Sequence, residues 1–279
     1  MADRFVTING VEICYEDNGD GYPLVLIHGF AMYKEFWKWH IKDFSEVFRV
    51  ITIDLRGCGN SEHPSEAYSM ETLSDDVKAL LDYLDLKKVH LGGHSFGGLV
   101  AQHFALNYRQ NLNKLILMST FASLPLDKSG LEMYKRSQLS FYEAKVENPT
   151  KAFWDKMKQR FSRPFFKEMV QNPNKQFHNR WNAKELMHLE ETKGTSKPQD
   201  ILNQIYAITT HNTLDRLNEI NNDTLILAAA KDKIVSPLAC ELLNEKLPES
   251  RLFMFDSSHF FMLEETPEFI SIVMNFLKE

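Results

Sequence analysis

Short apolar runs alternate with longer amphipathic segments along most of this chain. Continuous apolar runs suit strands that are buried on both faces of a sheet, and apolar residues repeating every three to four positions suit helices that cover it. The runs that predict strands are 23–27, 50–53, 89–91, 115–118, 224–228 and 251–255. The segments that predict helices are about 36–48, 70–84, 96–108, 212–220, 237–246 and 266–277.

The N-terminus follows a different pattern. Two short strand-like segments, 4–8 and 11–16, are joined by Asn9-Gly10, a pair that favours a tight hairpin turn. In the remainder, alternation of buried strands with helices indicates βαβ units. The sequence therefore predicts an α/β fold: a mostly parallel eight-stranded sheet flanked by helices, with an antiparallel hairpin at one edge.

The strand signal disappears between residues 123 and 208. This stretch is rich in aromatic, methionine and charged residues and is punctuated by prolines, which predicts several short helices. We expect residues 1–122 and 209–279 to form the α/β core, with 123–208 as a helical insertion. Most of its aromatic side chains should pack on the core, and a minority should line a cleft.

Composition narrows the class of protein. Hydrophobic residues make up 43% and charged residues 25% of the chain, and the net charge of −6 contains no basic block. These values are typical of a globular protein and argue against nucleic acid or an anionic membrane as a partner. Cys14, Cys58 and Cys240 lie far apart, as expected for reduced thiols. With no signal peptide or membrane helix evident, we expect a cytoplasmic protein.

The junction between strand 89–91 and the next helix carries the strongest chemical signal. Residues Gly93 to Gly97 read G-H-S-F-G, a match to G-x-S-x-G, in which a sharp strand-to-helix turn exposes the hydroxyl of Ser95. Glycine on both sides removes Cβ atoms that would collide in so tight a turn. The pattern also occurs by chance, so a catalytic serine needs a base, a carboxylate and oxyanion donors elsewhere.

Catalytic groups in parallel sheets gather beyond the carboxyl ends of strands, and this rule selects among ten histidines. His259 follows strand 251–255 directly and is the predicted base. Asp232, after strand 224–228, is the predicted carboxylate that orients the base. Asp256 is a rival, but its three-residue separation from His259 makes a good pair awkward, and Asp54 is a weaker rival.

An oxyanion would need two backbone donors. The N–H of Phe96, directly after the serine, and the N–H of Phe30, in the loop after strand 23–27, are the natural candidates. No cofactor is required. We expect no metal either, because His90 and His94 share an i,i+4 spacing on a strand and turn, which does not place them on one face.

These residues resemble the α/β-hydrolase fold superfamily. The order Ser95, Asp232, His259 is that superfamily's order of nucleophile, acid and base. Residues 28–30 (H-G-F) look like its oxyanion motif, and residues 54–61 resemble the D-x-R-G-x-G-x-S loop of its cap-bearing members. Residues 258–260 (S-H-F) are similar to its C-terminal histidine segment, and the insertion at 123–208 corresponds in position to its variable helical cap.

The resemblance implies hydrolysis of a small-molecule substrate through an acyl-enzyme. A carboxylic ester or lactone with an apolar part is our first expectation, with His28, Phe30, Trp154 and Phe260 as candidate substrate contacts. C–C bond hydrolases of ring-cleavage products, thioesterases, aminopeptidases and perhydrolases use the same triad, and a non-catalytic ligand-binding protein is a further alternative. Serine in place of aspartate at the turn argues against the haloalkane dehalogenase and soluble epoxide hydrolase branches.

Overall fold

One sheet organises the part of the chain that the computed structural model describes, residues 2–124 and 126–279. Its strand order is β1-β2-β4-β3-β5-β6-β7-β8. Neighbours from β4 and β3 through to β8 are parallel, whereas β1 and β2 form an antiparallel hairpin at one edge. The predicted architecture, a mostly parallel eight-stranded sheet flanked by helices, is confirmed.

The elements alternate as the apolar pattern indicated. The strands are β1 (Arg4–Ile8), β2 (Val11–Asn18), β3 (Tyr22–Ile27), β4 (Phe48–Ile53), β5 (Val89–His94), β6 (Leu112–Met118), β7 (Thr224–Ala229) and β8 (Ser250–Phe255). The helices around them are α1 (Lys38–Ser45), α2 (Met70–Tyr83), α3 (Phe96–Asn107), α9 (Pro237–Lys246), α10 (Phe261–Glu264) and α11 (Thr266–Lys278).

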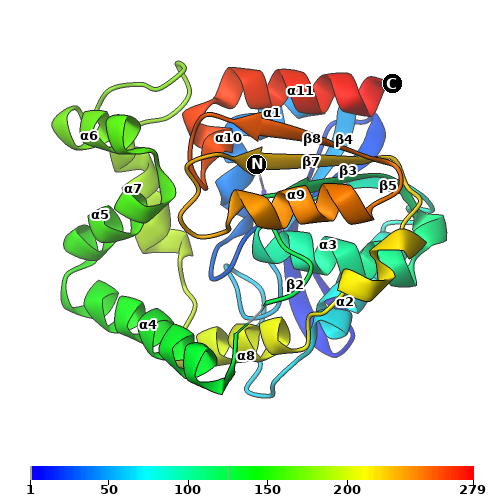
Figure 1. The fold of residues 1–279 in the computed structure, drawn as a ribbon, viewed down its shortest axis with the longest axis horizontal. Helices are drawn as coiled ribbons and strands as arrows, with labels where there is room; N and C mark the ends of the chain where they lie inside the picture. The colour runs from blue at the N-terminus through cyan, green and yellow to red at the C-terminus, as the bar shows by residue number, and fades with distance from the viewer. Residues whose placement is uncertain (1, 125) are drawn as a thin grey trace.

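Helices cover both faces of the sheet (Figure 1). In β3, Val25 and Ile27 pack into one apolar cluster with residues of α2, α3 and α9. Leu24 and Leu26 pack into a second cluster with residues of α1 and α11. Because successive strand side chains point to opposite faces, a continuous apolar strand supplies both layers.

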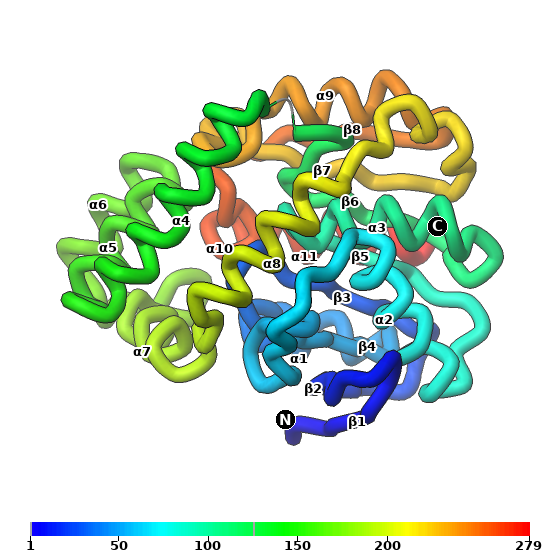
Figure 2. The backbone as a smooth tube through the Cα atoms, turned by 90° about the horizontal axis from the view of Figure 1, so that it is seen from below, coloured from blue at the N-terminus to red at the C-terminus, as the bar shows by residue number. Residues whose placement is uncertain are grey.

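Five helices lie between β6 and β7 in sequence: α4 (Lys128–Glu147), α5 (Pro149–Arg160), α6 (Arg163–Gln171), α7 (Ala183–Lys193) and α8 (Pro198–Thr209). Figures 1 and 2 show α4 to α7 gathered beside one end of the sheet, with α8 leading back toward the core. The insertion is hydrogen-bonded to the segment after His259: Phe260 N–H donates to Arg160 O (2.9 Å) and Trp181 Nε1 donates to Leu263 O (3.2 Å).

Two predicted helices differ in form. The segment expected at 36–48 consists of a 3₁₀ turn, η1 (Lys34–Trp37), followed by α1, because the chain must reverse into β4. The helix expected at 212–220 is a 3₁₀ turn, η3 (Leu214–Glu219). There, Asn212 is bridged to Ser123, and Thr213 N–H donates to Ala122 O (2.9 Å). These bonds hold the backbone extended until just before η3.

None of the helices in the described residues is long and apolar enough to cross a membrane.

The turn between β5 and α3 is closely packed against β3. Ser95 has φ 52° and ψ −113°, a conformation that residues with side chains rarely adopt. A Cβ on Gly93 would lie 2.2 Å from the backbone oxygen of Gly97, and one on Gly97 would lie 2.6 Å from the backbone oxygens of Ile27 and His28. Gly97 therefore permits α3 to start against the end of β3, and Gly93 permits the first turn of α3 to lie close to the end of β5.

We expect Gly97→Ala to lower the free energy of unfolding by about 2 kcal/mol or more, because rigid backbone atoms surround the new methyl group. Urea denaturation checks this. Gly130→Ala in α4 is the control: its new methyl would meet only the side chains of Leu126 and Asp127, the nearest atom being Leu126 Cδ2 at 3.2 Å. It should be neutral or stabilise by up to about 1 kcal/mol. Equal losses for both variants would contradict this account of the turn.

Six histidines are buried in the folded protein with depressed pKa values: His28, His40, His90, His94, His103 and His211. Burial is the main cause, and it lowers the pKa of His28, His40 and His90 to about 4. The unfolded chain, with histidine near its ordinary value, then binds more protons between about pH 6.5 and 4. The stability that the buried neutral histidines contribute is therefore lost as the pH falls from about 6.5 to about 4. Burial raises the pKa of Asp54 to about 6, and the pKa values of Glu16, Glu264, Glu265 and His63 are raised as well, so these groups partly oppose the effect of the histidines.

We expect stability to fall from pH 7 to pH 5 and His90→Phe to flatten that fall by up to about 1.4 kcal/mol per pH unit, the effect of one proton. His90 lies between the rings of Tyr22 and Phe48, so phenylalanine suits the site. Urea denaturation across this pH range is the measurement. His188→Phe, at an exposed position, should leave the slope unchanged. A wild-type protein that gained stability on acidification would contradict the account.

Candidate active site

Ser95 stands at the carboxyl edge of the sheet, where β5 passes into α3. Its N–H donates to Met118 O (2.7 Å), and its carbonyl accepts hydrogen bonds from Gly98 N–H (2.9 Å) and Thr120 Oγ1 (2.8 Å). Its half-buried side chain lines a cavity of about 150 Å³. Apolar cavities of that size hold a molecule such as benzene. The backbone of Ser95 is thus fixed from three sides while its side chain faces open space.

Asp232 and His259 form a hydrogen-bonded pair beside this cavity. Asp232 lies in the loop after β7 and His259 in the loop after β8, and His259 Nδ1 is 2.8 Å from Asp232 Oδ2. Their side chains are 1% and 4% exposed. The other carboxylate oxygen accepts the N–H groups of Ile234 (2.8 Å) and Val235 (3.0 Å). His259 lines the same cavity as Ser95.

The charge of this pair follows from its surroundings. Burial alone would raise the pKa of Asp232, but the His259 imidazole and the two backbone N–H groups hold that pKa below its usual value. The carboxyl group is therefore ionised near neutral pH and accepts the Nδ1–H of His259. That bond fixes the tautomer of the neutral ring and leaves Nε2 as the proton acceptor.

Phe30 and Phe96, whose backbone N–H groups were predicted as oxyanion donors, both line the same cavity. Phe96 is the first residue of α3, where a helical N–H has no intrahelical acceptor. Within the described residues, neither N–H donates a hydrogen bond. A donor at the start of a helix, joined by a second donor in the loop after β3, suits a developing negative charge.

His94 is a supporting residue that the sequence reasoning missed. Its fully buried ring reaches the cavity wall, and its ring centre lies 4.7 Å from that of His259. Its Nε2 donates to the carbonyl of His259 (3.1 Å). Burial and the neighbouring His259 lower the pKa of His94 well below its usual value, so the ring is neutral. His94 therefore helps to position His259.

The rival carboxylates lie in other environments. Asp256 is exposed and pairs with Lys231 (2.8 Å). Asp54 is buried and accepts the N–H groups of Lys34 (2.6 Å) and Asn60 (3.0 Å). Neither is hydrogen-bonded to His259, which leaves Asp232 as its partner.

Two of the four candidate substrate contacts line the cavity, Phe30 and Phe260. His28 is a correction: Leu55 N–H donates to its Nε2 (3.2 Å), its Nδ1 lies 2.8 Å from Gly29 O, and it is absent from the cavity wall. Trp154 is another, because its ring packs on Phe153 and Phe166 away from this wall. Apolar side chains follow a strand or helix pattern whether or not they meet a ligand, so sequence spacing could not separate the two cases.

The insertion contributes wall residues that the sequence did not single out. Tyr134 and Gln138 come from α4, and Arg160 is the last residue of α5. A polar residue on an inserted helix has no pattern that distinguishes a cavity position from a solvent position. The sequence therefore contains no signal that could have identified these three residues as part of the cavity wall.

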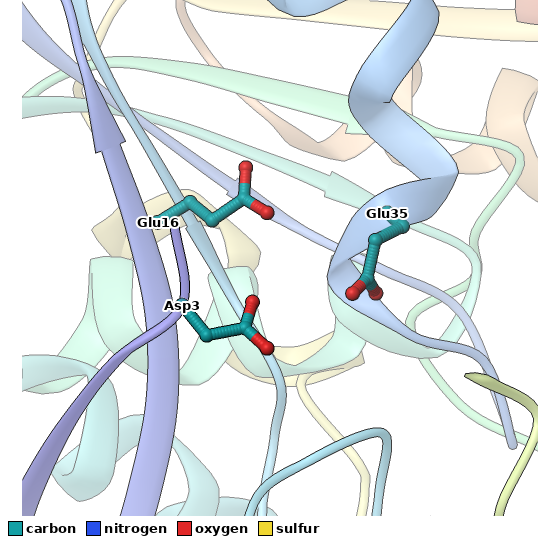
Figure 3. A group of neighbouring side chains, drawn as sticks. All are labelled: Asp3, Glu16 and Glu35. Atoms are coloured by element: carbon teal, nitrogen blue, oxygen red, sulfur yellow. The ribbon is translucent and has the colours of Figure 1, made fainter. Parts of the chain in front are cut away.

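Among the described residues, one group of three acidic side chains is close enough together to suggest a metal site: Asp3, Glu16 and Glu35 (Figure 3). The ammonium of the buried Lys34 lies among them, 2.8 Å from Asp3, 4.0 Å from Glu16 and 2.9 Å from Glu35. Lys193 of α7 is also 2.8 Å from Glu35. The cluster is an ion-pair network that connects the N-terminal hairpin to α7.

Comparison with known proteins identifies the family that this chain matches. The model of the alpha/beta hydrolase fold matches residues 22–266. A soluble epoxide hydrolase of Corynebacterium sp. is 38% identical over 117 residues, which cover 42% of this chain and 41% of that protein. The AB hydrolase superfamily protein YisY of Bacillus subtilis is 28% identical, with 99% of each chain covered.

A solved structure gives the same result in three dimensions. A thermophilic esterase from Thermogutta terrifontis superposes with a TM-score of 0.82 at 26% identity, covering 100% of this chain and 98% of the esterase. The family match spans most of the chain, and the superposition extends over nearly the full length of both chains. The chain belongs to the alpha/beta hydrolase fold family.

Proposed function

We propose that this protein is a serine hydrolase that cleaves a carboxylic ester or lactone through an acyl-enzyme. The observation that carries the proposal is the 2.8 Å bond between His259 and Asp232 beside a cavity that Ser95 also lines. A serine hydroxyl is a weak nucleophile, and a neutral imidazole held by a carboxylate is the base that activates it.

In the proposed reaction, Ser95 Oγ attacks the substrate carbonyl while His259 Nε2 takes its proton. The tetrahedral oxyanion accepts hydrogen bonds from the N–H groups of Phe30 and Phe96, each worth roughly 3 kcal/mol to the transition state. His259 then protonates the leaving alcohol, and the acyl group stays on Ser95. Water repeats the sequence with His259 as base and releases the acid.

Residues 123–208 are proposed to act as a cap over this site. Seven of their residues line the cavity together with Ser95: Leu124, Tyr134, Gln138, Phe141, Gln159, Arg160 and Ile208. The remaining walls include Leu99, Phe121 and other apolar side chains. A substrate with an apolar part gains affinity there by burying that surface.

Epoxide opening, the activity named for one relative, fits the serine poorly. Attack of a serine hydroxyl on an epoxide carbon would leave an ether, which has no carbonyl for water to attack. Acylation of the same serine leaves an ester that a second His259-assisted attack can hydrolyse. The side chain at position 95 therefore favours acyl transfer.

Replacing Ser95 by alanine should abolish ester hydrolysis, with kcat reduced by about 10⁶-fold, because no nucleophile remains. Turnover of short p-nitrophenyl esters is the assay. Ser119→Ala is the matched control, since Ser119 is a buried serine just beyond the neighbouring strand β6 and is not part of the cavity wall. Residual activity in Ser95→Ala equal to that of the control would remove the proposed nucleophile.

Asp232→Asn should reduce kcat by about 10⁴-fold while the protein stays folded, because the amide stabilises the wrong tautomer of His259. Steady-state kinetics and circular dichroism measure the two effects. Asp256→Asn alters the exposed rival carboxylate and should retain activity. The assignment fails if the Asp256 variant, and not the Asp232 variant, loses activity.

A further inference from the structure

Arg160 occupies a distinctive position at the boundary of two cavities. It is half-buried, and it lines both the cavity of Ser95 and His259 and a neighbouring one enclosed by α4, α5 and α7. The two cavities also share Phe30, Gln138 and Phe141. A group bound at the catalytic serine and extending into the insertion would therefore meet this guanidinium.

Among the residues that the structure describes, the guanidinium of Arg160 forms no direct ion pair, and the carboxylates of Glu190 and Asp232 act on its charge only from a distance. Within the described residues no carboxylate lies within 4.0 Å of its guanidinium, and Nη1 donates to the backbone oxygen of Lys156 (3.1 Å). By contrast, Lys156 itself pairs with Glu190 (2.5 Å). Arginine has five N–H donors and stays protonated at any working pH. A half-buried guanidinium without a direct ion pair gains from binding an anion, because the two charges then attract each other at close range in partly desolvated surroundings.

The position of Arg160 is fixed relative to the base. Its backbone oxygen accepts the N–H of Phe260 (2.9 Å), the residue directly after His259. Its guanidinium carbon lies 5.8 Å from the centre of the Phe260 ring. Because the backbone of Arg160 is held in this way, an ion pair between its guanidinium and a substrate can orient that substrate relative to Ser95 and His259.

We propose that Arg160 binds a carboxylate of the substrate, so that the preferred substrate is an ester or lactone that carries a second, free carboxylate. This inference rests on the proposed ester hydrolysis and adds its substrate class. The planar guanidinium matches a carboxylate in a two-point contact that a point charge does not provide. Tyr134 can add a donor, because burial raises its pKa to about 12 and keeps the phenol protonated.

Matched ester pairs test the substrate class. Monomethyl glutarate against methyl valerate places the charge on the acyl part, and 4-acetoxybutanoate against butyl acetate places it on the alcohol. We expect wild-type kcat/KM to favour the charged member of at least one pair by about 100-fold, mainly through KM. Arg160→Met should remove that preference, and Arg160→Lys should keep part of it. Arg136→Met, at an exposed position of α4, should retain it.

Binding separates this inference from the proposed function. With the inactive Ser95→Ala protein, calorimetry should show tighter binding of monomethyl glutarate than of methyl valerate. Adding Arg160→Met to that protein should weaken the binding of monomethyl glutarate by about 100-fold. The same preference with no turnover of any ester would support the role of Arg160 and refute ester hydrolysis. Equal binding and turnover of charged and neutral esters, or a preference that survives in Arg160→Met, would overturn the role of Arg160. Thermal melting of each variant confirms folding.

Discussion

The packing of α3 against β3 is the constraint on which the site depends. Gly97 allows the start of α3 to approach the end of β3, and Gly93 allows the first turn of α3 to fold back onto β5, in both cases to distances that a Cβ would prevent. That approach holds Ser95 in a conformation with positive φ and directs its side chain to the cavity. It also brings the start of α3 close to the loop that carries Phe30, whose ring centre lies 6.0 Å from that of Phe96. The positions of the proposed nucleophile and of the proposed oxyanion donors thus depend on how closely α3 packs against the sheet.

The parallel sheet then assembles the remaining groups. Strands β5, β7 and β8 end at the same edge, so loops far apart in sequence meet there. His259 depends on three supports: the carboxylate of Asp232, the ring of His94 against its own, and the hydrogen bond from His94 to its carbonyl. The segment after it is tied to the insertion through Arg160 and Trp181. The orientation of the base is therefore coupled to the helices that form the opposite wall.

The sequence predicted the fold well because strands buried on both faces leave an uninterrupted apolar signal. It also named Asp232 and His259, which the structure places within hydrogen-bonding distance, from their positions just after strands. The sequence did not predict the 3₁₀ turns at the segments 36–48 and 212–220. These turns depend on tertiary contacts: the first segment must turn into β4, and at the second Asn212 is bridged to Ser123. His28 and Trp154 were assigned to the substrate because of their residue type, whereas backbone bonds and ring packing decide their positions. Arg160 escaped notice because an unpaired charge becomes visible only when its neighbours are known.

The central claim is that Ser95 carries the acyl group during turnover. Rapid mixing with p-nitrophenyl acetate, acid quenching and peptide mass analysis test it most directly. The account predicts one acetyl group on the peptide that contains Ser95, formed together with a burst of p-nitrophenol and absent from the Ser95→Ala protein. Turnover without a covalent intermediate, or an acetyl group on a different residue that forms at the rate of turnover, would contradict it.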